Sequence, residues 1–151
     1  MKRLWLAIIH LVLLITLIFS HPAAVRAAEG EERTDVYHIL CVCSYSLSYM
    51  TVPQMLSGLE AGLSGLPFDI DYEFMDAENF YKPEDVSAFH DYISYKLKNG
   101  PTYDLLIICD DNAMRFWTNY HHELFPNLPM IFLGVNNISD AQTAADLPDV
   151  T

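Results

Sequence analysis

Basic residues are scarce in this sequence. Eight lysines and arginines stand against 20 aspartates and glutamates, which gives a formal net charge of −12. Such an acidic chain repels phosphate backbones and anionic lipid, so we expect no nucleic-acid partner. No single acidic block carries the charge, and a solvated surface accounts for it.

The motifs of common catalytic and phosphate sites are also missing. The chain has no Gly-x-Ser-x-Gly sequence and no glycine-rich loop after its first expected strand, the features of a hydrolase nucleophile and of a phosphate cradle. His121 and His122 are adjacent on an expected helix, so they cannot form the i, i+4 pair that a metal prefers. We therefore expect a chain that is not an enzyme, with no catalytic residue, metal or cofactor.

Only three cysteines occur. Cys41 and Cys43 are two apart on one expected strand, and Cys109 ends a strand that should be its neighbour. A metal site would need more ligands at recognisable spacing, so we interpret these residues as small buried apolar side chains. A Cys43–Cys109 disulfide is the alternative in an oxidising compartment, although it would need unusual geometry between adjacent strands.

The amino terminus has the layout of an export signal. Two basic residues precede an apolar run over residues 4–19, and small residues follow at 23–28. This pattern predicts a signal peptide over residues 1–27; an uncleaved membrane anchor is the alternative. Residues 28–36 are polar and are expected to be a linker. Either alternative places the rest of the chain outside the cytoplasm, in the periplasm or at the cell surface.

Strand and helix patterns alternate after the linker. Short apolar runs predict strands over 36–44, 68–75, 105–109 and 130–133. The second run alternates apolar and acidic residues, which favours a position near a sheet edge. Helical spacing fills the intervals between the strands, with Pro53 and Pro83 in first turns and Asp111 as the N-cap of the third helix. No convincing periodicity follows Asn137.

This order predicts the fold class. Helical crossovers between successive strands imply parallel pairing with right-handed connections. We expect an α/β fold, a three-layer doubly wound parallel sheet in the order 2-1-3-4, over residues 37–137. The first and third strands then lie side by side, at the point where a ligand crevice opens.

Polar and aromatic residues gather at the carboxyl ends of the predicted strands. Such a set suits a small polar or aromatic molecule. Asp110 and Asp111 also resemble a carboxylate pair for acid–base chemistry, but a helix cap and a solvent-facing strand end are the preferred interpretation. The candidate ligand-binding residues are Ser44, Tyr45, Tyr49, Asp76, Asp110, Asp111, Asn136 and Asn137.

A longer pattern runs through the same residues. It comprises Ser44-Tyr45, Gly58, Met75-Asp76, DDNAMRF at 110–116, ELFP at 123–126 and GVNN at 134–137. This pattern resembles the ABC-transporter substrate-binding-like sensor domains. Such periplasmic-binding-protein-type modules stand at the amino terminus of bacterial sensor histidine kinases and diguanylate cyclases, and also occur as freestanding binding proteins. The resemblance covers residues 37–137.

The resemblance implies a type I periplasmic-binding-protein fold that clamps its ligand between two lobes. Residues 37–137 would be the amino-terminal lobe and residues 138–151 the start of a truncated crossover. Ser44, Tyr45, Asp111 and Asn136 would border the cleft. Thr51 stands where members often carry tryptophan, so that aromatic contact is absent or comes from Tyr49.

The function that we expect is small-molecule recognition outside the cytoplasm, by the sensor domain of a bacterial signalling receptor. The partners implied are a small-molecule ligand, a second lobe, and a membrane and output domain of the full-length protein. The full receptor could also form a homodimer. Two alternatives remain. One is the substrate-binding protein of an ABC transporter. The other is a secreted flavodoxin-like hydrolase, which would require a nucleophile–base pair that the sequence does not show.

Overall fold

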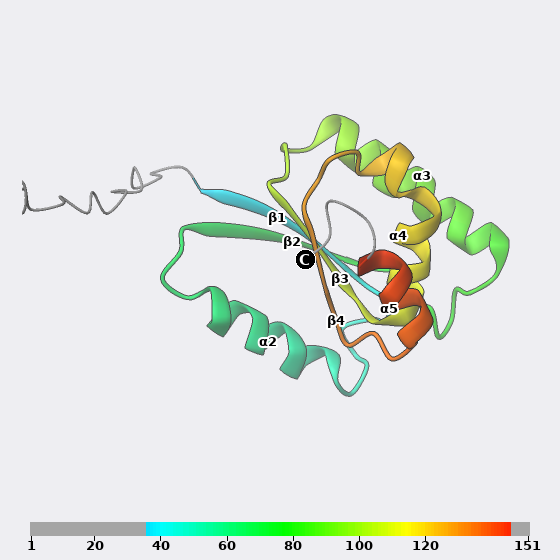
Figure 1. Cartoon of the computed structure of the whole chain (residues 1–151), viewed down its shortest axis with the longest axis horizontal. Coiled ribbons are helices and arrows are strands. Elements are labelled where there is room, and N and C mark those ends of the chain that lie inside the picture. Colours follow the sequence, from blue (N-terminus) through cyan, green and yellow to red (C-terminus); the bar gives the residue numbers. More distant parts are fainter. Residues whose placement is uncertain (1–35, 146–151) are drawn as a thin grey trace, which may run out of the picture. The chain divides into compact units, whose positions relative to one another are not determined.

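The computed structural model describes residues 36–145, which form one sheet with helices on both faces (Figure 1). Its elements are β1 (Tyr37–Cys43), α2 (Val52–Leu63), β2 (Phe68–Phe74), α3 (Pro83–Asn99), β3 (Leu105–Cys109), α4 (Asp110–Leu124), β4 (Met130–Leu133) and α5 (Ile138–Ala145). All strand pairs are parallel and their order is β2-β1-β3-β4. The predicted α/β class and strand order are therefore confirmed. The predicted signal and most of the linker lie outside the described residues.

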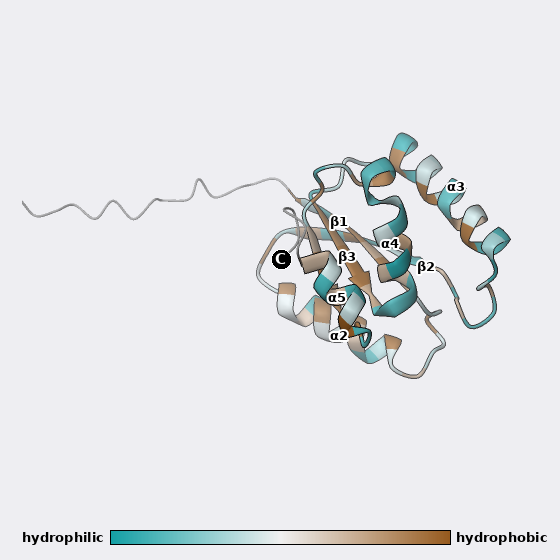
Figure 2. Ribbon diagram, turned by 45° about the vertical axis from the view of Figure 1, so that its right-hand side comes forward, coloured by the Kyte–Doolittle hydropathy of each residue, from teal (hydrophilic) through white to brown (hydrophobic). Residues whose placement is uncertain are grey.

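The sheet separates two apolar cores. On one face α2 packs alone, with Leu56 and its neighbours against β1 and β3. On the other face α3, α4 and α5 lie together (Figure 1). The hydrophobic colour runs along the central strand β3 in Figure 2, as expected for a strand that is covered on both faces. Among the helices described, none has the length and apolar character needed to cross a bilayer.

Each of the three longer helices buries one face, as helical spacing predicts. Val52 and Leu56 of α2 are buried, and Ile93 of α3 is fully buried. In α4 the residues at helical spacing that face the sheet include Phe116 and Trp117. The prolines stand in the first turns of α2 and α3, where a missing N–H costs nothing.

Helix α5 was not predicted. It spans only Ile138–Ala145, and Ala144 is its one buried residue, too few apolar contacts for a visible periodicity. The Asn137 side-chain oxygen accepts hydrogen bonds from the backbone N–H groups of Ser139 and Asp140, at 3.1 and 3.4 Å. The sequence feature that indicates this helix is the capping residue Asn137, not a pattern of apolar residues.

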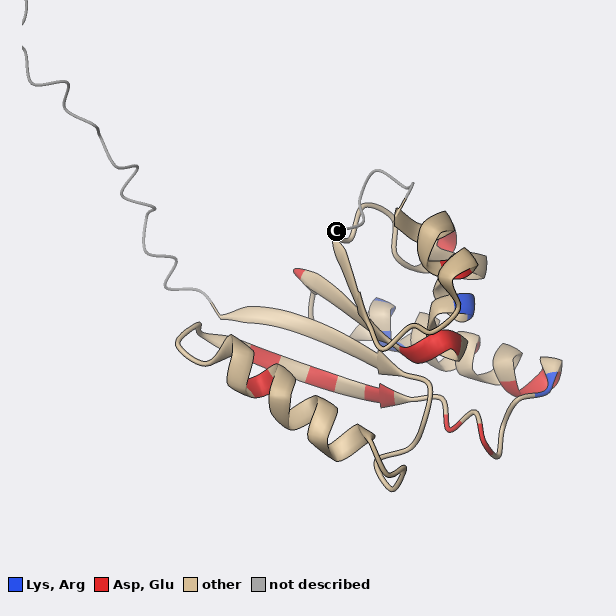
Figure 3. Cartoon of the chain, turned by 60° about the horizontal axis from the view of Figure 1, so that its bottom comes forward, with Lys and Arg blue, Asp and Glu red and all other residues tan. Residues whose placement is uncertain are grey.

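The face of β2 that is turned toward α3 carries a partly buried charge network. Acidic residues alternate along this edge strand (Figure 3). The Lys96 ammonium of α3 lies 2.6 Å from the Glu73 carboxylate and 3.0 Å from that of Asp71, and the Tyr103 hydroxyl donates to Asp71 at 2.5 Å. Glu73 is buried, so Lys96 neutralises a carboxylate that water reaches poorly.

Replacing this cation should destabilise the fold. Lys96→Met leaves the Glu73 carboxylate buried without its cation, and we expect a loss of about 2 kcal/mol in the free energy of unfolding, measured with urea on the full chain. Lys98→Met is the matched control, because Lys98 is exposed on the same helix, and its effect should stay within about 0.5 kcal/mol. Equal losses of stability in the two variants would contradict a stabilising role of the Lys96 ion pairs.

The same network predicts an acid-sensitive contribution from Asp71. The Tyr103 hydroxyl and Lys96 hold the pKa of the Asp71 carboxyl below its usual value, against the effect of burial. The stabilisation is therefore present above the unfolded aspartate pKa of about 3.9 and is lost as the pH falls through the lowered value. Asp71→Asn should thus be less stable than the unmodified chain at neutral pH, and the two urea midpoints should converge in acid. A constant difference at every pH would show that the charge of Asp71 is not involved.

Candidate ligand-binding site

A buried hydroxyl joins the ends of the two central strands. Ser44, directly after β1, has no exposed surface. Its Oγ donates to the Cys109 carbonyl at 2.9 Å and accepts from the Ala113 backbone N–H at 2.8 Å. Ser44 thereby contacts both the carbonyl of Cys109, the N-cap residue of α4, and an N–H group near the start of the same helix. Its hydroxyl hydrogen is committed inside the protein, so in this structure Ser44 positions the edge and does not face a ligand.

Helix α4 begins with a left-handed residue. Asp110 has φ +68°, and Gly134, in the turn after β4, has φ +68° as well. A Cβ atom at position 134 would lie 3.2 Å from the Asp110 Oδ1, so both the backbone conformation and the close approach favour glycine there. Burial, and the adjacent Asp111 carboxylate, raise the pKa of the Asp110 carboxyl.

The prediction that Asp111 is the N-cap of α4 is wrong. The N-cap position is Cys109, two residues earlier, and no side-chain hydrogen bond caps the helix there. The Asp111 Oδ1 instead accepts from the backbone N–H groups of Asn136 and Asn137, at 2.8 and 2.9 Å. Asp111 therefore ties the loop between β4 and α5 to the start of α4.

The remaining predicted residues lie around the same carboxyl edge. The rings of Tyr45 and Tyr49 stack with centroids 4.3 Å apart, and burial together with the charge of Asp110 raises the pKa of Tyr45. Asp76 has φ +49°, and its carboxylate accepts from the Asn79 side-chain amide. The end of β2 is held to the same edge, because the Ala77 N–H donates to the Ser44 carbonyl at 2.8 Å.

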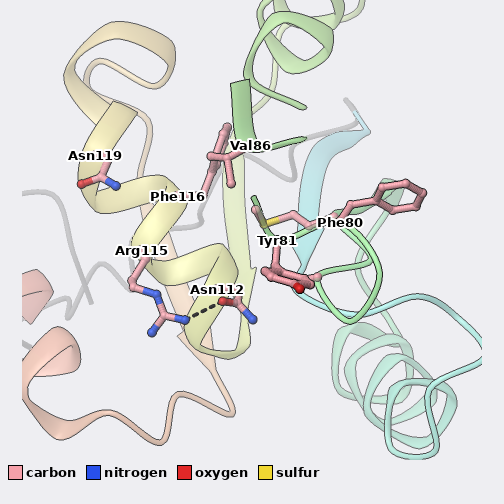
Figure 4. A pocket seen from close by; sticks show the side chains of 9 residues that line it. Phe80, Tyr81, Val86, Asn112, Arg115, Phe116 and Asn119 are labelled. Carbon is pink, nitrogen blue, oxygen red and sulfur yellow. Dashed lines mark hydrogen bonds between the residues drawn. The ribbon is translucent and has the colours of Figure 1, made fainter. Parts of the chain in front are cut away.

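A pocket of about 410 Å³ opens beside these residues, between the β2–α3 loop and α4 (Figure 4). Its wall combines apolar and aromatic side chains with two amides and a guanidinium. None of the predicted ligand-binding residues lines it. The lining residues are Met75, Ala77, Phe80, Tyr81, Val86, Asn112, Arg115, Phe116 and Asn119.

The sequence held two signals for this pocket. Phe80 and Tyr81 are aromatic residues in a loop, and both are exposed. Asn112, Arg115 and Asn119 recur at spacings of three and four, which places them on one face of α4. Only the fold shows that this loop and this helix face meet.

Arg115 is the only arginine among residues 36–145. Its guanidinium donates to the Asn112 side-chain oxygen, as Figure 4 shows, and lies 3.8 Å from the Asp140 carboxylate of α5. About half of the Arg115 side chain is exposed. The pocket thus offers a cation that is partly solvated and only loosely paired.

No protein-family model matches this chain. Searches of curated proteins and of solved structures likewise found no match. The resemblance to substrate-binding-like sensor domains therefore rests on the residues quoted from the sequence.

The three cysteines are free, and all are buried as predicted. The Cys41 Sγ lies 3.8 Å from that of Cys43 and 3.7 Å from that of Cys109. The third thiol thus joins the Cys-x-Cys pair from the neighbouring strand, as the predicted strand order implies, and no disulfide joins the three.

The Ser44 contacts predict a specific cost. Ser44→Ala removes two buried hydrogen bonds, worth about 1 kcal/mol each, and we expect the free energy of unfolding to fall by about 2 kcal/mol. Ser57→Ala, at an exposed position of α2, is the control and should change it by less than about 0.5 kcal/mol. Urea unfolding of the full chain measures both. If Ser44→Ala were as stable as the control, Ser44 would not be the residue that holds this edge.

Proposed function

We propose that residues 37–137 are the ligand-binding lobe of an extracytoplasmic bacterial receptor that recognises a small solute. The observation that carries this proposal is the pocket between the β2–α3 loop and α4, at the carboxyl edge of a parallel sheet. Ligands of open α/β sheets bind at this edge, next to the point where the strand order reverses. In this chain the reversal lies between β1 and β3, which Ser44 joins.

The pocket wall indicates the chemistry of the solute. Phe80, Phe116 and Met75 supply an apolar surface, and Arg115 with Asn112 supplies hydrogen-bond donors. Few precise polar groups in an apolar wall are typical of small-molecule sites. A guanidinium binds a carboxylate through two parallel hydrogen bonds. We therefore infer a small carboxylate with an aromatic or aliphatic body.

Receptor and transporter alternatives share this recognition step. Both need a second lobe to close over the ligand by a hinge motion. A membrane span and a kinase or cyclase in the same polypeptide would favour the receptor, and neighbouring permease genes would favour transport. The hydrolase alternative gains no support, because the Ser44 hydroxyl is paired with backbone groups and not with a histidine.

Two probes of similar shape and opposite charge test the site. Isothermal titration calorimetry on the full chain should show binding of phenylacetate but not of benzylamine, because Arg115 attracts the carboxylate and repels the ammonium. Arg115→Met should weaken phenylacetate binding by about tenfold or more, as expected for a lost hydrogen bond to a charged group.

Lys98→Met is the charge-matched control for this experiment. It removes one positive charge from α3, where Lys98 is exposed and lines no part of the pocket, so phenylacetate affinity should not change. Equal binding of the two probes, equal effects of the two variants, or no binding of phenylacetate would contradict the proposed ligand class.

A further inference from the structure

All three cysteines of the sequence meet at one place. Cys41 and Cys43 are two apart on β1, so their side chains point to the same face of the sheet. Cys109 ends β3 and pairs in register with Cys43. Their sulfur atoms all lie within 4.8 Å of one another.

The cluster lies in the apolar core between the sheet and α2. Its cysteines are at most 1% exposed, and their neighbours there include Val52, Leu56 and Ile107. Any small apolar side chain would fill such positions. Packing alone therefore does not explain why every thiol of the chain occupies this one site.

We propose that Cys41, Cys43 and Cys109 form a three-coordinate binding site for a soft monovalent cation, Cu(I). This proposal is independent of the ligand pocket, which lies on the other face of the sheet. Thiolates are the ligands that select soft metals. A trigonal site with metal–sulfur bonds of about 2.3 Å requires sulfurs about 4 Å apart, and the separations of 3.7 and 3.8 Å come close to this.

The donor set excludes the commoner cations. Structural zinc takes four ligands, and iron–sulfur clusters are held by four cysteines. Within residues 36–145, no histidine, aspartate or glutamate joins the three sulfurs. Calcium and magnesium require oxygen ligands. Three thiols in an apolar surround therefore suit Cu(I) best.

We infer that the cation would enter from the carboxyl edge of the sheet. Cys43 and Cys109 are the last residues of β1 and β3. Tyr45 and Tyr49, from the loop that follows β1, are half-buried and pack against the same core. A rearrangement of this loop would expose the thiols without breaking a strand pair.

Competition against a Cu(I) chelator tests the proposal. The full chain, reduced and kept free of oxygen, should take one Cu(I) from bathocuproine disulfonate. X-ray absorption should then show three sulfur neighbours at about 2.3 Å, a bond length typical of metal thiolates. Cys43→Ala and Cys109→Ala should each weaken binding by more than about 100-fold, because loss of a ligand exceeds the cost of losing an outer-shell partner.

Ile107→Val is the matched control. Ile107 is buried in the same core and pairs in register with Cys41, so this variant alters packing but removes no sulfur. Its Cu(I) affinity should equal that of the unmodified chain, and circular dichroism should show that the cysteine variants remain folded.

Three results would overturn the proposal. They are Cu(I) affinity unchanged in the folded cysteine variants, a metal neighbourhood with fewer than three sulfurs, and a purified chain whose mass shows two cysteines already joined as a disulfide.

Discussion

The carboxyl edge of the sheet depends on one serine hydroxyl. Ser44 directly follows β1. Its hydroxyl accepts from the Ala113 N–H of α4 and donates to the Cys109 carbonyl at the end of β3. The end of β1 is thereby fixed to the junction of β3 and α4, 65 residues away in the sequence, in a buried environment where an unpaired polar group would be costly. With α4 fixed, Asp110 can hold its left-handed conformation against Gly134, and Asp111 can reach the loop after β4.

This arrangement changes what the polar residues of the edge do. Ser44, Asp111 and Asn137 form hydrogen bonds within the protein and shape the edge. The groups that face open space come from the next layer outward, namely the β2–α3 loop and the exposed face of α4. The polar residues at the strand ends therefore hold the elements around the candidate pocket in place, but they do not line it.

Most of the fold could be predicted because its determinants are local. The continuous apolar runs of β1 and β3 predict strands that are covered on both faces, and the alternation in β2 predicts an edge strand. The role of Asp111 could not be predicted, since its partners are 25 and 26 residues away. Helix α5 is too short to show a period, and its asparagine cap was the only sign of it. The pocket and the meeting of Cys109 with Cys41 depend on strand register and loop placement, which single-residue patterns do not specify.

Chemical-shift mapping by NMR tests the account most directly. A second pocket, of about 300 Å³, lies at the amino edge of the sheet between Pro101 and Leu128, and serves as an internal control. When phenylacetate is added to the nitrogen-15-labelled full chain, the largest shifts should fall on residues 77–81 and 112–119. Shifts confined to residues 101–103 and 124–128, or absent from both regions, would contradict recognition at the carboxyl edge.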